Sequence, residues 1–445
     1  MSSPQHSQSS SNSSAESEEF NEAVSNWWVT YDRWLNATKM RIANGDEGSS
    51  QQRQKRSYID RNREDGHTRL FNDYFSDNPV YTDQQFRRRF RMRRHVFIRI
   101  VERLTTEMEY FQQRPDATGR LGLSPLQKYT VAICMLAYGV AADMVDDYIR
   151  IRESTTRKCL INFVEGIISF FGDEYLRRPT ATDLQRLLFV ADVRGFPGMM
   201  GSIDCMHWTW KNCPAAWKGQ FERGDHGVPT VILEAVASYD LWIWHSFFGT
   251  PGTCNDINVL DRSPIFNDVL NGRAPEVNFV VNGHQYSMGY YLTDGIYPEW
   301  ATFVQSIRLP RGPEEQLFAQ RQEAARKDVE RAFGVLQARF RIIRAPALIW
   351  DLKLIGKVMK ACIILHNMIV EDERDTYLHY TDISQFEQVE TNADDSSTWS
   401  FSTNRHIAMD EYLRNRVRLR SCETHRQLKA DLVEHIWQKF GSGDN

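Results

Sequence analysis

The sequence predicts an α/β fold in which a helical region precedes a region that contains a sheet. Residues 124–171 carry apolar side chains at helical spacing, whereas residues 195–294 contain short apolar runs of strand character. Two of these runs end in an aspartate, Asp204 and Asp294. Strands of an α/β sheet end in this way where they open onto a ligand-binding crevice. A long helical pattern over residues 314–343 follows and would cover the sheet.

Length and composition describe a globular chain with room for two or three domains. At 445 residues, with 41% hydrophobic and 25% charged residues, the chain can bury a large core. Its net charge of −4 leaves nucleic-acid binding to local basic patches. The 7 cysteines are scattered, which argues against a disulfide framework and fits a reducing compartment. No apolar run approaches the roughly 20 residues of a membrane span, so no membrane partner is expected.

Shifts in composition divide the chain into four segments. The first is rich in Ser, Gln and Asn, and we expect a disordered tail with one Trp-rich amphipathic stretch. A helical region, an α/β region that carries the predicted strands, and an acidic linker with a C-terminal helix follow. The boundaries are 1–67, 68–194, 195–372 and 373–445.

Two apolar stripes near the ends of the chain are candidate docking surfaces. The first contains Trp27, Trp28 and Trp34, and the second runs along residues 428–440 at i, i+4 spacing. Either stripe could bind a partner or pack on this chain, and the sequence leaves both possibilities open.

Basic residues are concentrated in the helical region. Six of the eight positions from 87 to 94 are arginine, which predicts either a solvated helix face or a strip that contacts phosphates. Residues 124–171 have the pattern of a helix-turn-helix, in which Ser124 and Pro125 start the first helix and residues 154–158 start the last. The candidate DNA contacts here are Arg87, Arg88, Arg91, Arg94, Arg157 and Lys158.

Tryptophan and lysine lie side by side in the segment after the first predicted strand. Such pairs can stack on an unpaired base or cover a phosphate. The alternative is that the tryptophans pack against the edge of the sheet. The candidate DNA contacts of this segment are Trp210, Lys211 and Lys218.

Four acids stand in distinctive settings: Asp204, Asp256, Asp294 and Glu330. Carboxylates that converge on one crevice repel one another unless a divalent cation binds, and oxygen ligands favour Mg²⁺ or Mn²⁺. A two-metal site of this kind stabilises the attacking and leaving oxygens of a phosphoryl transfer. Each acid alone is also explained as a cap, a turn residue or a surface pair.

Longer blocks surround these acids and carry a family resemblance. They are Gly201-Ser-Ile-Asp-Cys-Met-His-Trp, Asn255-Asp-Ile-Asn-Val, Leu292-Thr-Asp-Gly-Ile-Tyr-Pro and Val329-Glu-Arg-Ala-Phe-Gly. These blocks resemble the nuclease domain of the PIF/Harbinger transposases, most closely the plant Pong-like branch. The resemblance implies a ribonuclease-H-like mixed sheet with flanking helices and a DDE site that uses Mg²⁺ or Mn²⁺. By position, Asp204, Asp294 and Glu330 would be catalytic, and Asp256 would be a fourth metal ligand.

The resemblance also implies a function and partners. We expect a nuclear transposase subunit, a metal-dependent DNA endonuclease and strand transferase that excises and inserts a Harbinger/Pong-type transposon. Its expected partners are transposon terminal inverted repeats, T/A-rich target DNA, a Myb/SANT-like protein from the same element, and a second copy of the chain. The alternative is a domesticated descendant that binds DNA or chromatin without cleavage.

Overall fold

The computed structural model describes residues 61–117, 119–139, 148–224, 227–274, 277–374 and 409–441. The predicted N-terminal tail with its Trp-rich stretch, the middle helix of the predicted helix-turn-helix, and the acidic linker lie outside the described residues. The chain divides into two compact units, each assembled from three stretches of sequence. The first comprises Met1–Phe170, Thr209–Lys218 and Gln337–Cys362; the second comprises Phe171–Trp208, Gly219–Leu336 and Ile363–Asn445.

The described part of the first unit is helical. Its elements are α2 (Arg63–Tyr74), α3 (Asp83–Phe90), α4 (Arg94–Glu107), η1 (Glu109–Phe111), α5 (Pro125–Tyr138), most of α7 (Glu153–Tyr175), α13 (Arg341–Arg344) and the start of α14 (Leu352–Asp372). The predicted start of α5 is confirmed, because the Ser124 side chain accepts the Gln127 N–H in a capping box and Pro125 is the first helical residue. Gly139, with φ 62°, ends that helix.

Residues 82–105 form two helices, although their apolar pattern runs on without a break. α3 ends at Phe90, and Arg91 takes the left-handed conformation with φ 63°. Phe86, Phe90 and Phe97 then pack together, with the Phe86 and Phe90 ring centroids 4.3 Å apart. The corner therefore gathers aromatic side chains from both helices into one core.

The second unit contains a mixed five-stranded sheet in the order β3-β2-β1-β6-β7. The hairpin of β2 and β3 is antiparallel, while β6 is parallel to both β1 and β7. This arrangement confirms the predicted mixed sheet with flanking helices. The strands are β1 (Met199–Thr209), β2 (Thr230–Ala237), β3 (Ile243–Pro251), β6 (Tyr290–Thr293) and β7 (Phe303–Gln305), and β4 (Phe279–Val281) pairs with β5 (His284–Tyr286) separately.

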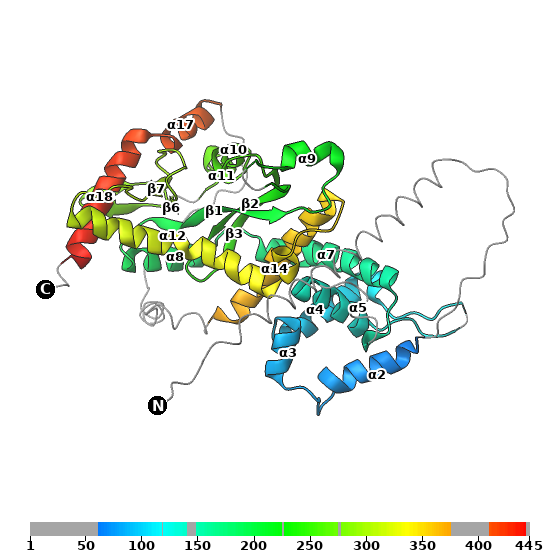
Figure 1. The fold of residues 1–445 in the computed structure, drawn as a ribbon. Coiled ribbons are helices and arrows are strands. Elements are labelled where there is room, and N and C mark those ends of the chain that lie inside the picture. The colour runs from blue at the N-terminus through cyan, green and yellow to red at the C-terminus, as the bar shows by residue number, and fades with distance from the viewer. Residues whose placement is uncertain are drawn as a thin grey trace, which may run out of the picture. The chain divides into compact units, whose positions relative to one another are not determined.

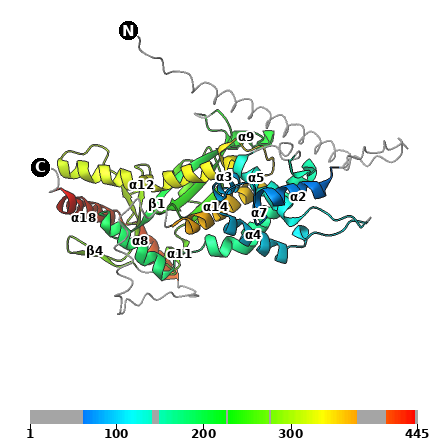
Figure 2. The same ribbon diagram turned by 90° about the horizontal axis from the view of Figure 1, so that it is seen from below.

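Helices cover both faces of the sheet (Figures 1 and 2). One apolar cluster joins the sheet to α8, α12 and α18, and another joins the opposite face to α10 and α17. A β-bulge between Met199 and Gly201 shifts the register of β1, so Met199 belongs to the first cluster and Ile203 to the second. The helices of this unit are α8 (Ala181–Val193), α10 (Asp256–Leu260), α11 (Asn267–Leu270), most of α12 (Pro313–Arg339), α17 (Met409–Leu419) and α18 (Cys422–Phe440). Most of α9 (Ala215–Phe221) belongs to the first unit.

The C-terminal stripe belongs to the core of its own chain. Leu428, Leu432 and Ile436 on α18 are at most 1% exposed and pack in the same cluster as Leu292 of β6. Of the two possibilities that the sequence left open, the structure therefore shows packing on this chain. The predicted use of this stripe as a docking surface for a partner is wrong, because the side chains are already buried.

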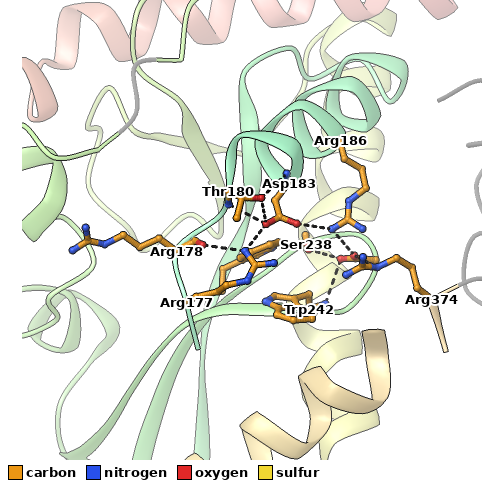
Figure 3. A network of polar contacts seen from close by, with 10 residues as sticks. Arg177, Arg178, Thr180, Asp183, Arg186, Ser238, Trp242 and Arg374 are labelled. Atoms are coloured by element: carbon orange, nitrogen blue, oxygen red, sulfur yellow. Dashed lines mark hydrogen bonds and ion pairs between the residues drawn. The ribbon is translucent and has the colours of Figure 1, made fainter. Parts of the chain in front are cut away.

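A buried polar network fixes the turn of the β2–β3 hairpin (Figure 3). Asp240 in this turn is 1% exposed, and its Oδ1 accepts the Ser238 hydroxyl at 2.5 Å. Arg186 of α8 lies 3.4 Å from Asp240 Oδ2, and Arg374 lies 3.9 Å from the same oxygen. The two arginines compensate a carboxylate that would be costly to bury alone.

The same network caps α8. Thr180 and Asp183 form a reciprocal capping box, and Arg177 donates to the Asp183 carboxylate (Figure 3). Burial raises the pKa of Asp183, but the hydrogen bonds from Arg177 and Thr180 outweigh it and leave that pKa below its ordinary value. The carboxylate is therefore ionised and holds the start of α8 in place.

Candidate active site

The four predicted acids lie on the second unit. The prediction that a strand ends at Asp204 is wrong, because β1 continues to Thr209 and Asp204 lies in its middle, whereas Asp294 directly follows β6 as predicted. Ser202 pairs with Leu292 in parallel register, so Asp204 and Asp294 lie at the same level on neighbouring strands. Asp256 is the first residue of α10, and Glu330 lies on α12. We call these four residues the acidic set.

Asp204 is the acid most perturbed by its surroundings. Its side chain is 19% exposed, and its Oδ1 accepts the backbone N–H of Cys205 at 2.8 Å. Burial raises the pKa of Asp204 to about 6, the Cys205 N–H and Arg326 act to lower it, and the charges of Asp294 and Asp256 raise it. Three carboxylates of the acidic set therefore act on one another electrostatically.

Asp256 is held at the start of a short helix. The Asn255 side chain accepts the Asn258 N–H at 2.9 Å and so caps α10. Burial raises the pKa of Asp256, a hydrogen bond with the Cys205 side chain acts to lower it, and the charge of Asp294 raises it. Asp256 is thus coupled electrostatically to Asp204 and Asp294.

Asp294 lies in a tight turn that other residues support. Its Oδ1 accepts the N–H of Ile296 at 3.0 Å, the pattern of an Asx turn. Arg308 donates to the carbonyl of Gly295 at 2.9 Å. Asp294 is therefore both a turn residue and a member of the acidic set.

Glu330 is joined to Asp204 by an arginine. Arg326 Nη1 lies 2.7 Å from Glu330 Oε1 and 3.5 Å from Asp204 Oδ2. The predicted apolar stripe of α12 is buried, with Val329, for example, at 0% exposure, and the Glu330 side chain at its margin is 44% exposed. Sequence reasoning missed Arg326, although its position one helical turn before Glu330 places both on one face.

A further buried carboxylate lies close to the acidic set. Glu234 of β2 is fully buried, accepts the Ser263 hydroxyl, and lies 3.3 Å from His245 Nε2. Burial, followed by the charges of Asp256 and Glu234, raises the pKa of the Cys205 thiol. No motif in the sequence singled out Glu234, because its neighbours in β2 are almost all apolar.

The carboxylate oxygens of the acidic set are the type of ligand that suits a divalent cation. Carboxylate oxygens are the ligands that Mg²⁺ and Mn²⁺ prefer, and burial of Asp204 beside two other acids creates a place where added positive charge is favourable. In the described ranges, however, no three or more His, Cys, Asp or Glu side chains are close enough together to hold a metal ion. Arg326 supplies the positive charge between Asp204 and Glu330 instead.

The arginine strip of the first unit is partly engaged in local packing. Arg87 and Arg88 are exposed on α3. Arg91 lies 4.9 Å from the Tyr138 ring centroid, and Arg94 lies 3.0 Å from Asp83. Some of these arginines therefore have local partners, an acid or an aromatic ring, although their crowding in the sequence suggested too few.

The other predicted DNA contacts differ in exposure. Lys158 is exposed and Arg157 is half-buried in the first turns of α7, and Lys211 and Lys218 are exposed. Trp210 is 0% exposed, and its indole N–H donates to the carbonyl of Ile349 at 2.8 Å. The prediction that Trp210 contacts DNA is wrong, because its ring is packed inside the first unit.

No helix in the described ranges combines the length and apolar character that crossing a membrane requires.

One family model covers the part of the chain that carries the acidic set. Residues 173–377, which include all four acids, match the family described as "Plant transposon protein". Residues 66–105, which include the arginine strip, match a domain of unknown function.

Curated relatives show low but extended similarity. The chain is 23% identical over 303 residues to the human protein named "Putative nuclease HARBI1", a match that covers 66% of this chain and 80% of the relative. It is 24% identical over 265 residues to "Protein ALP1-like" of Arabidopsis thaliana, covering 57% of this chain and 63% of the relative. No solved structure matches the chain.

Proposed function

Because the part of the chain that carries the acidic set belongs to the plant transposon proteins of the Harbinger transposase-derived family, we propose that this chain is a transposase catalytic subunit. It would be a metal-dependent DNA endonuclease and strand transferase that excises and integrates a Harbinger/Pong-type transposon. The observation that carries the proposal is the electrostatic coupling of Asp204, Asp256 and Asp294, together with the arginine Arg326 that contacts both Asp204 and Glu330.

The acidic set would hold Mg²⁺ or Mn²⁺, which when bound stabilises the attacking and leaving oxygens of an in-line phosphoryl transfer. Asp204, Asp294 and Glu330 are the proposed catalytic acids, and Asp256 is a further metal ligand. The chain's own contribution is rigidity, because the N–H groups of Cys205 and Ile296 fix the carboxylates of Asp204 and Asp294. The mixed five-stranded sheet that supports them is consistent with a ribonuclease-H-like fold.

The proposed reaction needs no protein nucleophile. Water would cleave the strand and free a 3′-hydroxyl, and that hydroxyl would then attack the target strand. The only nucleophilic side chain adjacent in sequence to Asp204 is Cys205. Burial raises the pKa of its thiol, which keeps it protonated and a poor nucleophile. This state of Cys205 supports a mechanism in which the attacking oxygen comes from outside the protein.

DNA and partner binding complete the proposal. Arg87, Arg88, Arg157 and Lys158 are the proposed phosphate contacts of the helical unit, together with Lys211 and Lys218. The DNA would be the terminal inverted repeats and a T/A-rich target. A Myb/SANT-like protein of the same element would supply sequence selectivity, and the complex would act in the nucleus as a homodimer or larger assembly.

A second candidate is a domesticated protein that binds DNA or chromatin without cutting it. The observation in its favour is that the described residues contain no group of three potential ligands at metal-binding range. Under this alternative, Arg326 would permanently neutralise Asp204 and Glu330, and added metal would not change the protein.

Glu330→Gln separates the two candidates. It removes a charge and keeps the shape, so the protein should fold and bind transposon-end DNA while metal-dependent cleavage falls by more than about 100-fold. Cleavage is measured on labelled terminal-repeat DNA with Mg²⁺ or Mn²⁺.

Glu314→Gln, at the exposed start of α12, is the matched control and should cut normally. If Glu330→Gln cuts like the wild type, the assignment of the acidic set is wrong. If the wild type binds DNA but never cuts it, the domesticated alternative is correct.

A further inference from the structure

The acidic set contains a cation of its own. Arg326 of α12 lies within 2.7 Å of Glu330 and 3.5 Å of Asp204, and the same nitrogen, Nη1, makes both contacts. The Arg326 side chain is 18% exposed and that of Asp204 is 19% exposed. The guanidinium group therefore lies among the carboxylates, where solvent screens its charge less than on an open surface.

An ordinary helix-stabilising pair does not account for this position. An arginine four residues before a glutamate is the weaker order for a charge pair on a helix. In addition, Arg326 contacts a carboxylate of the strand β1, so the contact joins α12 to the sheet. Neighbouring Lys327 is exposed and has the same charge, yet among the ion pairs of the described residues it is Arg326, not Lys327, that contacts the acidic set.

We propose that Arg326 is a positioning residue, an internal counter-ion that keeps Asp204 and Glu330 together until a divalent cation binds. The inference rests on the proposed function. The guanidinium group and the cation require the same carboxylate oxygens, so the two compete, and the guanidinium must withdraw when the cation binds. Arg326 thus lowers the metal affinity of the acidic set while it limits repulsion among the acids in the metal-free protein.

Competition of this kind has a defined signature in binding measurements. Without Arg326, the acids lose their counter-ion, so the metal-free protein should melt at a lower temperature. The same acids should bind metal more tightly, because no guanidinium has to leave. A merely structural arginine would lower the melting temperature with and without metal and would leave the affinity unchanged or weaker.

The test is a titration of the full chain with Mn²⁺ alone, without DNA, by isothermal calorimetry, with melting curves in EDTA and in Mn²⁺. Arg326→Gln should bind Mn²⁺ at least about 5-fold more tightly than the wild type. Arg326→Lys keeps the charge but loses the planar fork, so its affinity should lie between the two. Lys327→Gln removes the same charge from the adjacent position and should leave the affinity within about twofold of the wild type.

Asp204→Asn separates this inference from the proposed function. Wild-type binding that Asp204→Asn abolishes supports the metal site. If Arg326→Gln then binds Mn²⁺ equally or more weakly, the inference is overturned and the metal site stands. If the wild type shows no Mn²⁺ binding that depends on Asp204, both are overturned.

Discussion

The raised pKa of Asp204 makes the stability of the metal-free protein depend on pH. Its folded pKa is about 6, against an ordinary value of 3.8. The stabilisation that the proton on Asp204 provides is therefore complete below about pH 4 and disappears as the pH rises through about 6. Full loss corresponds to on the order of 3 kcal/mol.

Asp204→Asn should remove this dependence, because an amide cannot titrate. In EDTA, the variant should be more stable than the wild type at pH 7, and the difference should shrink on acidification from pH 7 to pH 5. Thermal melts at pH 5, 6 and 7 measure it. Wild-type and variant curves that stay the same distance apart at all three values would show that Asp204 has an ordinary pKa in the folded protein.

The sequence alone was enough to select the four acids, but it did not identify the residues that contact them. Asp204 and Asp294 end apolar runs, and Glu330 lies beside a buried stripe, so local patterns were enough to select them. Arg326 and Glu234 escaped notice because their roles come from contacts between elements that are distant in the chain. Local spacing carries no information about such contacts.

Among the secondary-structure elements, those with strong patterns were predicted well. The helix predicted over residues 314–343 is observed as α12 (Pro313–Arg339), and α5 begins at Pro125 as predicted. β7 has only three residues, which is too short to show the alternation typical of a strand. The corner between α3 and α4 was not predictable either, because the left-handed residue there is Arg91 and not a glycine. The bulge in β1 also depends on its partner strands, so the sequence alone could not locate it.

The pairing of β1 with β2 predicts a severe effect of Gly201→Ala. Gly201 has φ 152°, and a Cβ atom there would lie 2.6 Å from the carbonyl oxygen of Ala237. We expect the free energy of unfolding to fall by about 2–3 kcal/mol, measured by urea denaturation. Gly334→Ala is the control: nothing lies within 4 Å of its added methyl on α12, so it should stabilise by about 0.5–1 kcal/mol. Equal effects of the two substitutions would contradict the close approach of the strands.

At the scale of the whole molecule, α18 is part of the second unit's core. Leu432→Ala should therefore lower the free energy of unfolding by about 2–5 kcal/mol, because a fully buried side chain is removed. Leu413 on α17 is 48% exposed, so Leu413→Ala should change the free energy of unfolding by less than about 0.5 kcal/mol. Urea denaturation measures both. A stable Leu432→Ala protein that fails only in partner binding would restore this helix to its predicted role as a docking surface.

The position of α18 at the far end of the described chain also sets when the second unit can form during synthesis. The first unit's N-terminal helices leave the ribosome early, but the sheet that holds the acidic set lacks Leu428, Leu432 and Ile436 until α18 has emerged. At about 5–20 residues per second, translation from Glu330 to Phe440 takes on the order of 5–20 s. During that interval the nascent chain already contains all four acids but lacks the completed sheet that aligns them, so the proposed DNA cleavage would have to wait until α18 has been synthesised.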